Sequence, residues 1–117
     1  MTRLIFVRHG ETSINTDQKL HRYDDPELLN DAGLEQIRSL TTKLKIYSPS
    51  VIFTSGEKRA LQSAELIAAS LNVPLKINDG LRERNWGDYS GKPWSEVQAV
   101  LDKMSLEERY TFLPPNG

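Results

Sequence analysis

A histidine and an arginine stand side by side directly after an apolar run near the start of the chain. The run covers residues 4–7, and Arg8, His9 and Gly10 follow it. A neutral imidazole can attack phosphorus and carry the phosphoryl group, and a guanidinium offers paired N–H donors that match phosphate oxygens. Gly10 would let the backbone approach a ligand closely. The pair therefore indicates phosphoryl-transfer chemistry, and the alternative is a surface histidine at a strand end.

Two later segments supply the other groups that this chemistry requires. Arg59 follows the apolar run at 51–54, and Glu83 follows the run at 75–77. Ligands in open α/β sheets bind beyond the carboxyl ends of the strands, so we expect both residues to lie near His9. Arg59 would bind phosphate at a helix N-terminus, and the Glu83 carboxyl group could give a proton to the leaving oxygen. The arginines neutralise charge in this scheme, so it needs no metal and no cofactor.

Each of these residues also has an ordinary structural interpretation, and the sequence leaves both open. Arg59 could be a solvated helix residue that pairs with Glu57 or Ser63. Glu83 could form a loop salt bridge with a neighbouring arginine. Asn15 could bind phosphate or stabilise a turn. Glu57 itself is expected to be an ordinary solvated residue of a helix face.

The hydrophobic pattern places the elements that must position these groups. Strands are predicted at 3–7, 51–54 and 75–77, and helices at 31–46, 57–71, 93–103 and 105–111. The first strand is apolar on both faces, which is typical of a parallel sheet with helices on both sides, and residues 10–30 are polar and turn-rich. The alternation of strands and helices predicts an α/β fold, as a three-layer α/β/α domain with a mainly parallel sheet. We expect one domain over residues 1–117.

Composition excludes several function classes. The 117 residues carry 15 Lys and Arg against 16 Asp and Glu, a net charge of -1, which gives no general case for binding nucleic acid or an anionic membrane. The absence of cysteine excludes disulfides, thiolate metal sites and cysteine nucleophiles. The N-terminal apolar run is too short for a signal peptide or a membrane span, so a cytoplasmic location is expected. No G-x-G-x-x-G motif follows the first strand, which argues against a Rossmann nucleotide site.

Three segments together resemble the signature blocks of the histidine phosphatase superfamily, in its phosphoglycerate mutase-like branch. The matching segments are Arg8-His9-Gly10-Glu11-Thr12 with Asn15, residues 54–64, and residues 81–91. The resemblance implies a phosphohistidine mechanism in which His9 is the nucleophile, Glu83 is the proton donor, and Arg8 and Arg59 assist catalysis. It implies that the ligands of phosphate and substrate are Arg8, Asn15, Arg59, His21 and Arg22.

The segment after the third block bears on the type of reaction. Residues 91–96 are more similar to the phosphatases of the family than to its mutases, which carry extra loop sequence near the acid/base block. We therefore expect hydrolysis of a small phosphomonoester metabolite. Two alternatives stay open: phosphoryl transfer of the mutase type, and a non-catalytic phosphate-binding or interaction module.

One expected group is missing. The family uses a second histidine, which follows a late apolar strand in a short His-Gly motif, but the chain holds only His9 and His21. The resemblance thus predicts a domain truncated on its C-terminal side, without that late strand. Loss of a preorganised donor typically costs about two to three orders of magnitude in rate, so we expect the 117 residues to turn over weakly or not at all. His21 could substitute only if its loop came close to His9.

The missing strand also affects the predicted sheet. It would normally pair beside the strand at 3–7, and without it that strand would keep an unpaired apolar edge. Exposed edges aggregate, swap or recruit a partner. The sequence therefore predicts a homodimer formed through this edge as one form of the protein.

Overall fold

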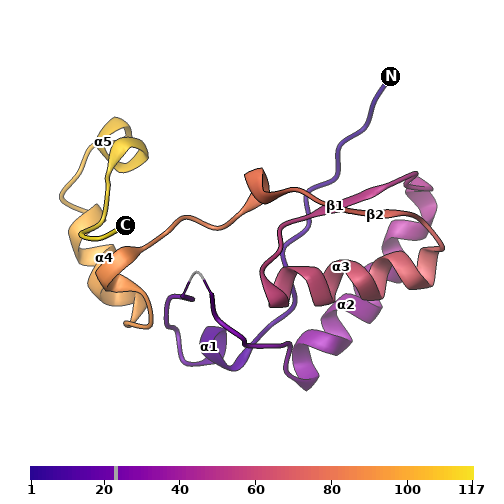
Figure 1. The fold of residues 1–117 in the computed structure, drawn as a ribbon, viewed down its shortest axis with the longest axis horizontal. Helices are drawn as coiled ribbons and strands as arrows, with labels where there is room; N and C mark the ends of the chain where they lie inside the picture. Colours follow the sequence, from indigo (N-terminus) through magenta and orange to yellow (C-terminus); the bar gives the residue numbers. More distant parts are fainter. Residues whose placement is uncertain (23) are drawn as a thin grey trace.

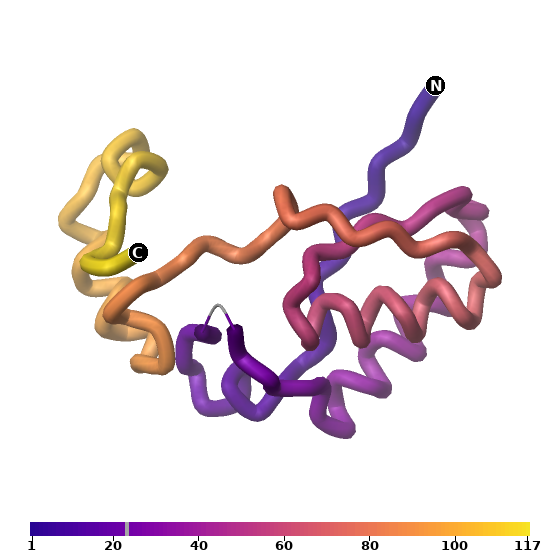
Figure 2. The backbone as a smooth tube through the Cα atoms, in the orientation of Figure 1, coloured from indigo at the N-terminus to yellow at the C-terminus, as the bar shows by residue number. Residues whose placement is uncertain are grey.

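The computed structural model describes residues 1–22 and 24–117 (Figures 1 and 2). The helices are α1 (Ser13–Thr16), α2 (Asp31–Leu44), α3 (Lys58–Leu71), α4 (Trp94–Leu101) and α5 (Leu106–Thr111), the strands are β1 (Ile52–Thr54) and β2 (Leu75–Ile77), and the short 3-10 helices are η1 (Lys45–Tyr47), η2 (Asp79–Leu81) and η3 (Gly87–Tyr89). All four predicted helices and two of the three predicted strands are confirmed, whereas α1 lies in a segment that we predicted to be a loop.

The sheet consists of β1 and β2, which pair in parallel with Ile52 opposite Leu75 and Thr54 opposite Ile77. Parallel neighbours need a crossover connection, and α3 provides it. Figure 1 shows α2 and α3 packed against each other on the same side of these strands. The predicted α/β class with a parallel sheet is confirmed, in an incomplete form.

The main hydrophobic cluster lies between α2 and α3. It consists of Leu29, Ile37, Leu44 and Ile67, with Leu34, Leu40, Ile52 and Leu71 packed against it. The spacing of the α2 residues places them on one helical face. The Asn30 side chain caps α2 by accepting the Gly33 N–H at 2.8 Å. The cap at Asn30 and the packing of this cluster thus hold α2 against α3.

A second, smaller cluster lies in the C-terminal part of the chain. Trp86, Val97 and Leu101 form its buried centre. In Figure 1 an extended segment leads from β2 to α4, and the pair α4 and α5 stands apart from α2 and α3. None of the helices in the described part of the chain is long and apolar enough to cross a membrane.

Residues 3–7 depart from the prediction. They form no ladder with another described segment, and the Leu4 and Phe6 side chains are 75% and 89% exposed. A strand needs a neighbour about 4.8 Å away to accept and donate its backbone hydrogen bonds, and none of the described segments takes that position. The prediction of a paired strand covered on both faces is therefore wrong for the described residues. The apolar run shows only that the segment is suited to a sheet.

Candidate active site

His9 lies at the end of the N-terminal segment, and contacts on both sides of its neighbour Gly10 hold the backbone there. The Gly10 N–H donates to the Ser63 hydroxyl at 3.0 Å, and that hydroxyl donates to the Arg59 carbonyl oxygen at 2.8 Å. On the other side, a Cβ added at Gly10 would lie 2.6 Å from the Gly33 carbonyl oxygen of α2, so a side chain does not fit. The close neighbour of Gly10 in the structure is thus α2, where we expected a ligand. These contacts bind the His9 backbone to the helix that carries Arg59.

The His9 ring has a defined tautomer. Its Nδ1 lies 2.7 Å from the Gly10 carbonyl oxygen, and because a carbonyl oxygen only accepts, Nδ1 carries the hydrogen and Nε2 keeps its lone pair. Burial lowers the pKa of His9 below its ordinary 6.5; the Arg59 and Arg8 guanidinium groups lower it further, whereas the Gly10 carbonyl and Glu83 raise it. The ring is therefore neutral at pH 7, in the form that a nucleophile requires.

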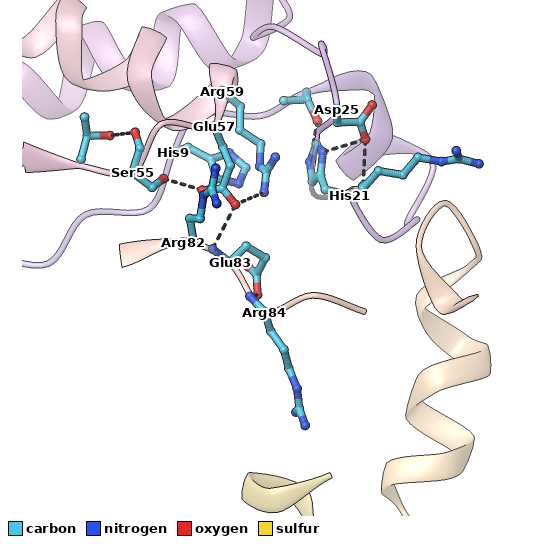
Figure 3. Close-up of polar contacts among 12 residues, drawn as sticks. His9, His21, Asp25, Ser55, Glu57, Arg59, Arg82, Glu83 and Arg84 are labelled. Atoms are coloured by element: carbon cyan, nitrogen blue, oxygen red, sulfur yellow. Dashed lines mark hydrogen bonds and ion pairs between the residues drawn. The ribbon is translucent and has the colours of Figure 1, made fainter. Parts of the chain in front are cut away.

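Arg59 is a buried cation with unused donors. It lies in the first turn of α3 and is 3% exposed. Its Nη2 lies 3.5 Å from Oε1 of Glu57, while its Nε and Nη1 have no hydrogen-bond partner among the described residues. An unsatisfied buried donor costs about 1–3 kcal/mol, and more in a charged group. Arg59 is thus not a solvated helix residue, and its guanidinium group lies beside the His9 ring (Figure 3).

Glu83 approaches the same place from the segment after β2. Its carboxylate is exposed and accepts the Arg84 backbone N–H at 2.8 Å. Its own backbone N–H donates to Oε1 of Glu57 at 3.0 Å. Figure 3 shows Glu83 near Glu57, and the charge of Glu83 raises the pKa of His9. The three segments predicted to meet at the strand ends do meet here.

Arg8 and Asn15 lie near His9, which lines the same groove. This open groove of about 430 Å³ lies between the N-terminal segment and α2. Arg8 is exposed, whereas Asn15 is half-buried and its Oδ1 accepts the Thr12 N–H at 3.1 Å in the capping box of α1. Asn15 therefore stabilises the turn, as its alternative interpretation required. That Asn15 also binds phosphate stays a prediction.

His21 is closer to His9 than its place in a polar loop suggested. The two rings meet edge to face with their centroids 5.6 Å apart. Nε2 of His21 lies 3.1 Å from the Thr12 hydroxyl, and its Nδ1 lies 3.6 Å from Oδ2 of Asp25. Burial is the main cause that lowers the pKa of His21 to about 4; Arg59 and His9 act in the same direction, and Asp25 opposes them. A second neutral imidazole thus faces the site.

Arg22 is the predicted site residue that the structure does not bring to His9. Its Nε would lie 3.4 Å from a Cβ added at Gly91, and Arg22 lines a separate hollow that Asn85 and Asn116 also line. In the described part of the chain, no group of three or more His, Asp and Glu side chains is placed to hold a metal ion.

Two residues of the site were not predicted. Glu57 was expected to be solvated, but it is 8% exposed and bonded to three neighbouring groups, so that prediction is wrong. Ser63 accepts the N–H of Gly10, next to His9, and so links this backbone to α3, whereas the sequence suggests it only as a partner for Arg59. One feature of the sequence could have indicated a role for Glu57: it lies between the end of a strand and the start of a helix, where the site forms.

Comparison with known proteins identifies related sequences over nearly all of the chain. The profile of the histidine phosphatase superfamily (branch 1) matches residues 4–116. The uncharacterized phosphatase PhoE of Bacillus subtilis is 40% identical over 96 residues, which is 82% of this chain and 49% of that protein. The phosphoglycerate mutase-like protein 4 of Arabidopsis thaliana is 37% identical over 99 residues, 83% of this chain and 43% of that protein.

A solved structure gives the same result. YhfR of Bacillus stearothermophilus is similar with a TM-score of 0.68 and 30% sequence identity, over 82% of this chain and 47% of that one. The chain therefore spans about half the length of the relatives that it matches. Residues 4–116, which the family profile matches, include all three segments that build the site.

Proposed function

The chain belongs to branch 1 of the histidine phosphatase superfamily, and we propose that its site hydrolyses a small phosphomonoester through a phosphohistidine at His9. The observation that carries the proposal is the buried Arg59 guanidinium, whose Nε and Nη1 have no partner among the described residues. A dianionic phosphate supplies the acceptors that such donors lack. Relatives named as phosphatases and as a phosphoglycerate mutase-like protein support the reaction class.

In the first step the phosphate binds and the imidazole attacks. Arg59 and Arg8 neutralise the phosphate oxygens, with Asn15 as a further donor. The lone pair of His9 Nε2 then forms a bond to phosphorus while the bond from phosphorus to the ester oxygen breaks. The Glu83 carboxyl group gives its proton to the leaving oxygen, so an alcohol departs.

In the second step water releases the phosphate. The Glu83 carboxylate takes a proton from the attacking water, whose oxygen bonds to phosphorus as the bond to Nε2 breaks. The products are inorganic phosphate and neutral His9, and Glu83 is protonated for the next cycle. Nδ1 keeps its hydrogen, and its hydrogen bond to the Gly10 carbonyl oxygen, throughout both steps, so the ring returns to the same tautomer.

The experiment that tests this proposal is phosphoryl labelling of the 117-residue chain. The chain is mixed with ³²P-labelled p-nitrophenyl phosphate, quenched in base, in which phosphohistidine is stable, and mapped by peptide. We expect label in the peptide that holds His9, and none in the His9→Ala variant. Any turnover that the 117 residues show should fall to the uncatalysed level in the variant, because the variant lacks the nucleophile.

The outcomes separate the alternatives. A chain that binds vanadate at Arg59 but never labels is a non-catalytic phosphate-binding module. A labelled chain that passes its phosphoryl group to a second alcohol in preference to water is a mutase-type transferase. Equal turnover by wild type and His9→Ala would exclude the phosphohistidine mechanism.

Two further predictions belong with this proposal. A second copy would pair along residues 3–7, whose exposed Leu4 and Phe6 side chains suit such a contact, and light scattering on the purified chain measures this directly.

A cytoplasmic location is the setting in which small phosphorylated metabolites are available, and fractionation of cells that express the chain tests it.

A further inference from the structure

We infer that Glu57 is a positioning residue: its buried carboxylate holds the Arg59 guanidinium and the backbone that carries Glu83 in one arrangement. The inference rests on the proposed function, since these are the groups that would bind phosphate and move the proton. It concerns a residue that touches neither the phosphate nor the leaving oxygen. Glu57 acts through its two neighbours.

The contacts of Glu57 carry the inference. It stands between β1 and α3, and its side chain is almost fully buried. Oε2 accepts a hydrogen bond from the Ser55 hydroxyl, and Oε1 accepts the Glu83 backbone N–H at 3.0 Å. The same Oε1 lies 3.5 Å from Nη2 of Arg59. One carboxylate thus joins the end of β1, the first turn of α3 and the segment after β2 (Figure 3).

Helix capping does not explain this burial. Glu57 is the N-cap residue of α3, yet its side chain makes no capping hydrogen bond to the helix. A buried carboxylate is costly unless it is paired and hydrogen-bonded, and its partners here all lie outside the helix backbone. The carboxylate therefore serves the site rather than the end of the helix.

The segment that carries Glu83 needs such an attachment. The pairing of β1 with β2 ends at Thr54 and Ile77, and the next backbone bond is from the Asn78 N–H to the Thr54 carbonyl oxygen at 2.8 Å. Glu83 lies beyond this point, after the turn of η2. The hydrogen bond from its backbone N–H to Glu57 attaches the proton donor to the start of the phosphate-binding helix. A shift of about 1 Å between these groups is enough to lower the rate greatly.

The charge of Glu57 makes the role testable, because two effects have opposite signs. A carboxylate near the phosphate site repels phosphate, so its removal should tighten binding if charge alone mattered. If Glu57 holds Arg59 in place, its removal should weaken binding instead. The direction of the change in phosphate affinity therefore distinguishes positioning from simple electrostatics.

The experiment compares Glu57→Leu and Glu57→Gln with Glu65→Gln, a matched control at an exposed carboxylate of α3. Affinity for inorganic phosphate is measured by calorimetry, with circular-dichroism melts to verify folding. We expect Glu57→Leu to bind at least about tenfold more weakly, a loss of about 1.4 kcal/mol. Glu57→Gln keeps an acceptor for the Glu83 N–H, so it should recover most of the affinity and bind about threefold more weakly than wild type. The control should match wild type.

Hydrogen exchange of the Glu83 amide gives a readout that needs no ligand. This amide should exchange faster in Glu57→Leu than in wild type or Glu65→Gln. A wild-type chain that binds no phosphate would defeat the proposed function, yet the exchange data would still decide whether Glu57 holds the Glu83 segment. Phosphate binding that is unchanged or tighter in Glu57→Gln, or a Glu83 amide unaffected in Glu57→Leu, would overturn the inference.

Discussion

Two arginines of this chain are held in opposite ways. Arg84 donates from Nη1 to the Arg109 carbonyl oxygen at 3.2 Å and from Nη2 to the Phe112 carbonyl oxygen. Its guanidinium also lies 4.9 Å from the centre of the Trp86 ring and 5.5 Å from that of Phe112. Arg59 is more deeply buried, but its Nε and Nη1 have no partner among the described residues.

The difference distinguishes a cation that stabilises the fold from the one that we propose binds phosphate. A guanidinium that donates to backbone carbonyl oxygens and stacks on aromatic rings stabilises the fold where it stands. A buried guanidinium with unsatisfied donors carries a cost that an anionic ligand removes when it binds. Arg84 therefore belongs to the C-terminal cluster, and Arg59 belongs to the site beside His9.

The strongest test of the comparison is Arg59→Met, which keeps the length of the side chain and removes its donors. We expect phosphate affinity to fall by about 2–3 kcal/mol, or about thirty- to 150-fold, because charge-assisted hydrogen bonds are lost. Calorimetry measures the loss. Thermal melts give a second readout, since phosphate should raise the melting temperature of wild type and leave that of the variant unchanged. Wild-type affinity in Arg59→Met would contradict the comparison.

The matched change in the other region is Arg84→Met. It removes the bonds to two carbonyl oxygens and the stacking on two rings, so the free energy of unfolding should fall by about 2 kcal/mol. Urea titration measures this, and hydrogen exchange should locate the loss in α5. Phosphate affinity should stay at the wild-type level, because the Glu83 carboxylate keeps its bond to the backbone N–H of residue 84. A loss of affinity equal to that in Arg59→Met would erase the distinction between the two arginines.

A smaller effect is expected from Arg59→Lys. Lysine keeps the positive charge but lacks the planar fork that meets two phosphate oxygens at once. We expect an affinity between those of wild type and Arg59→Met, about tenfold below wild type. Full wild-type affinity would mean that Arg59 acts only as a point charge.

A further test concerns pH and the histidine that faces the site. The pKa of His21 is about 4 in the folded chain against 6.5 ordinarily, so between these values the unfolded chain binds a proton that the folded chain does not. The contribution of His21 to the free energy of unfolding should therefore fall as pH drops from about 6.5 toward 4 and stay constant below that range. In His21→Gln the fall should be shallower, which urea titrations across this range would measure. Identical slopes would show that His21 is not held neutral by the fold.

The sequence is sufficient to predict that His9, Arg59 and Glu83 lie close together, but not which residues hold them there. His9, Arg59 and Glu83 each follow an apolar run, and the rule that ligands bind at the carboxyl ends of strands brings them together. Glu57 was missed because its burial arises only when the segment after β2 folds back over the start of α3. This is a tertiary contact between distant segments, and the periodicity of apolar residues within a helix does not predict it.

The same limit explains the error at residues 3–7. An apolar pattern reports a preference for a sheet interior, but a strand forms only where another segment accepts its hydrogen bonds. Ile52 has that neighbour in Leu75, whereas Leu4 has none among the described residues. The closeness of His21 to His9 was equally hidden, since it depends on the bond of His21 to the Thr12 hydroxyl.

The measurement that tests the central claim most directly is a phosphate titration of the intact chain, followed through the guanidinium Nε–H resonances of its arginines by NMR. One experiment then observes both arginines under the same conditions. We predict that the Arg59 signal shifts and saturates with phosphate, while the Arg84 signal stays where it is. If the Arg59 signal does not move, or if both signals move alike, then Arg59 is not the phosphate-binding cation of this site.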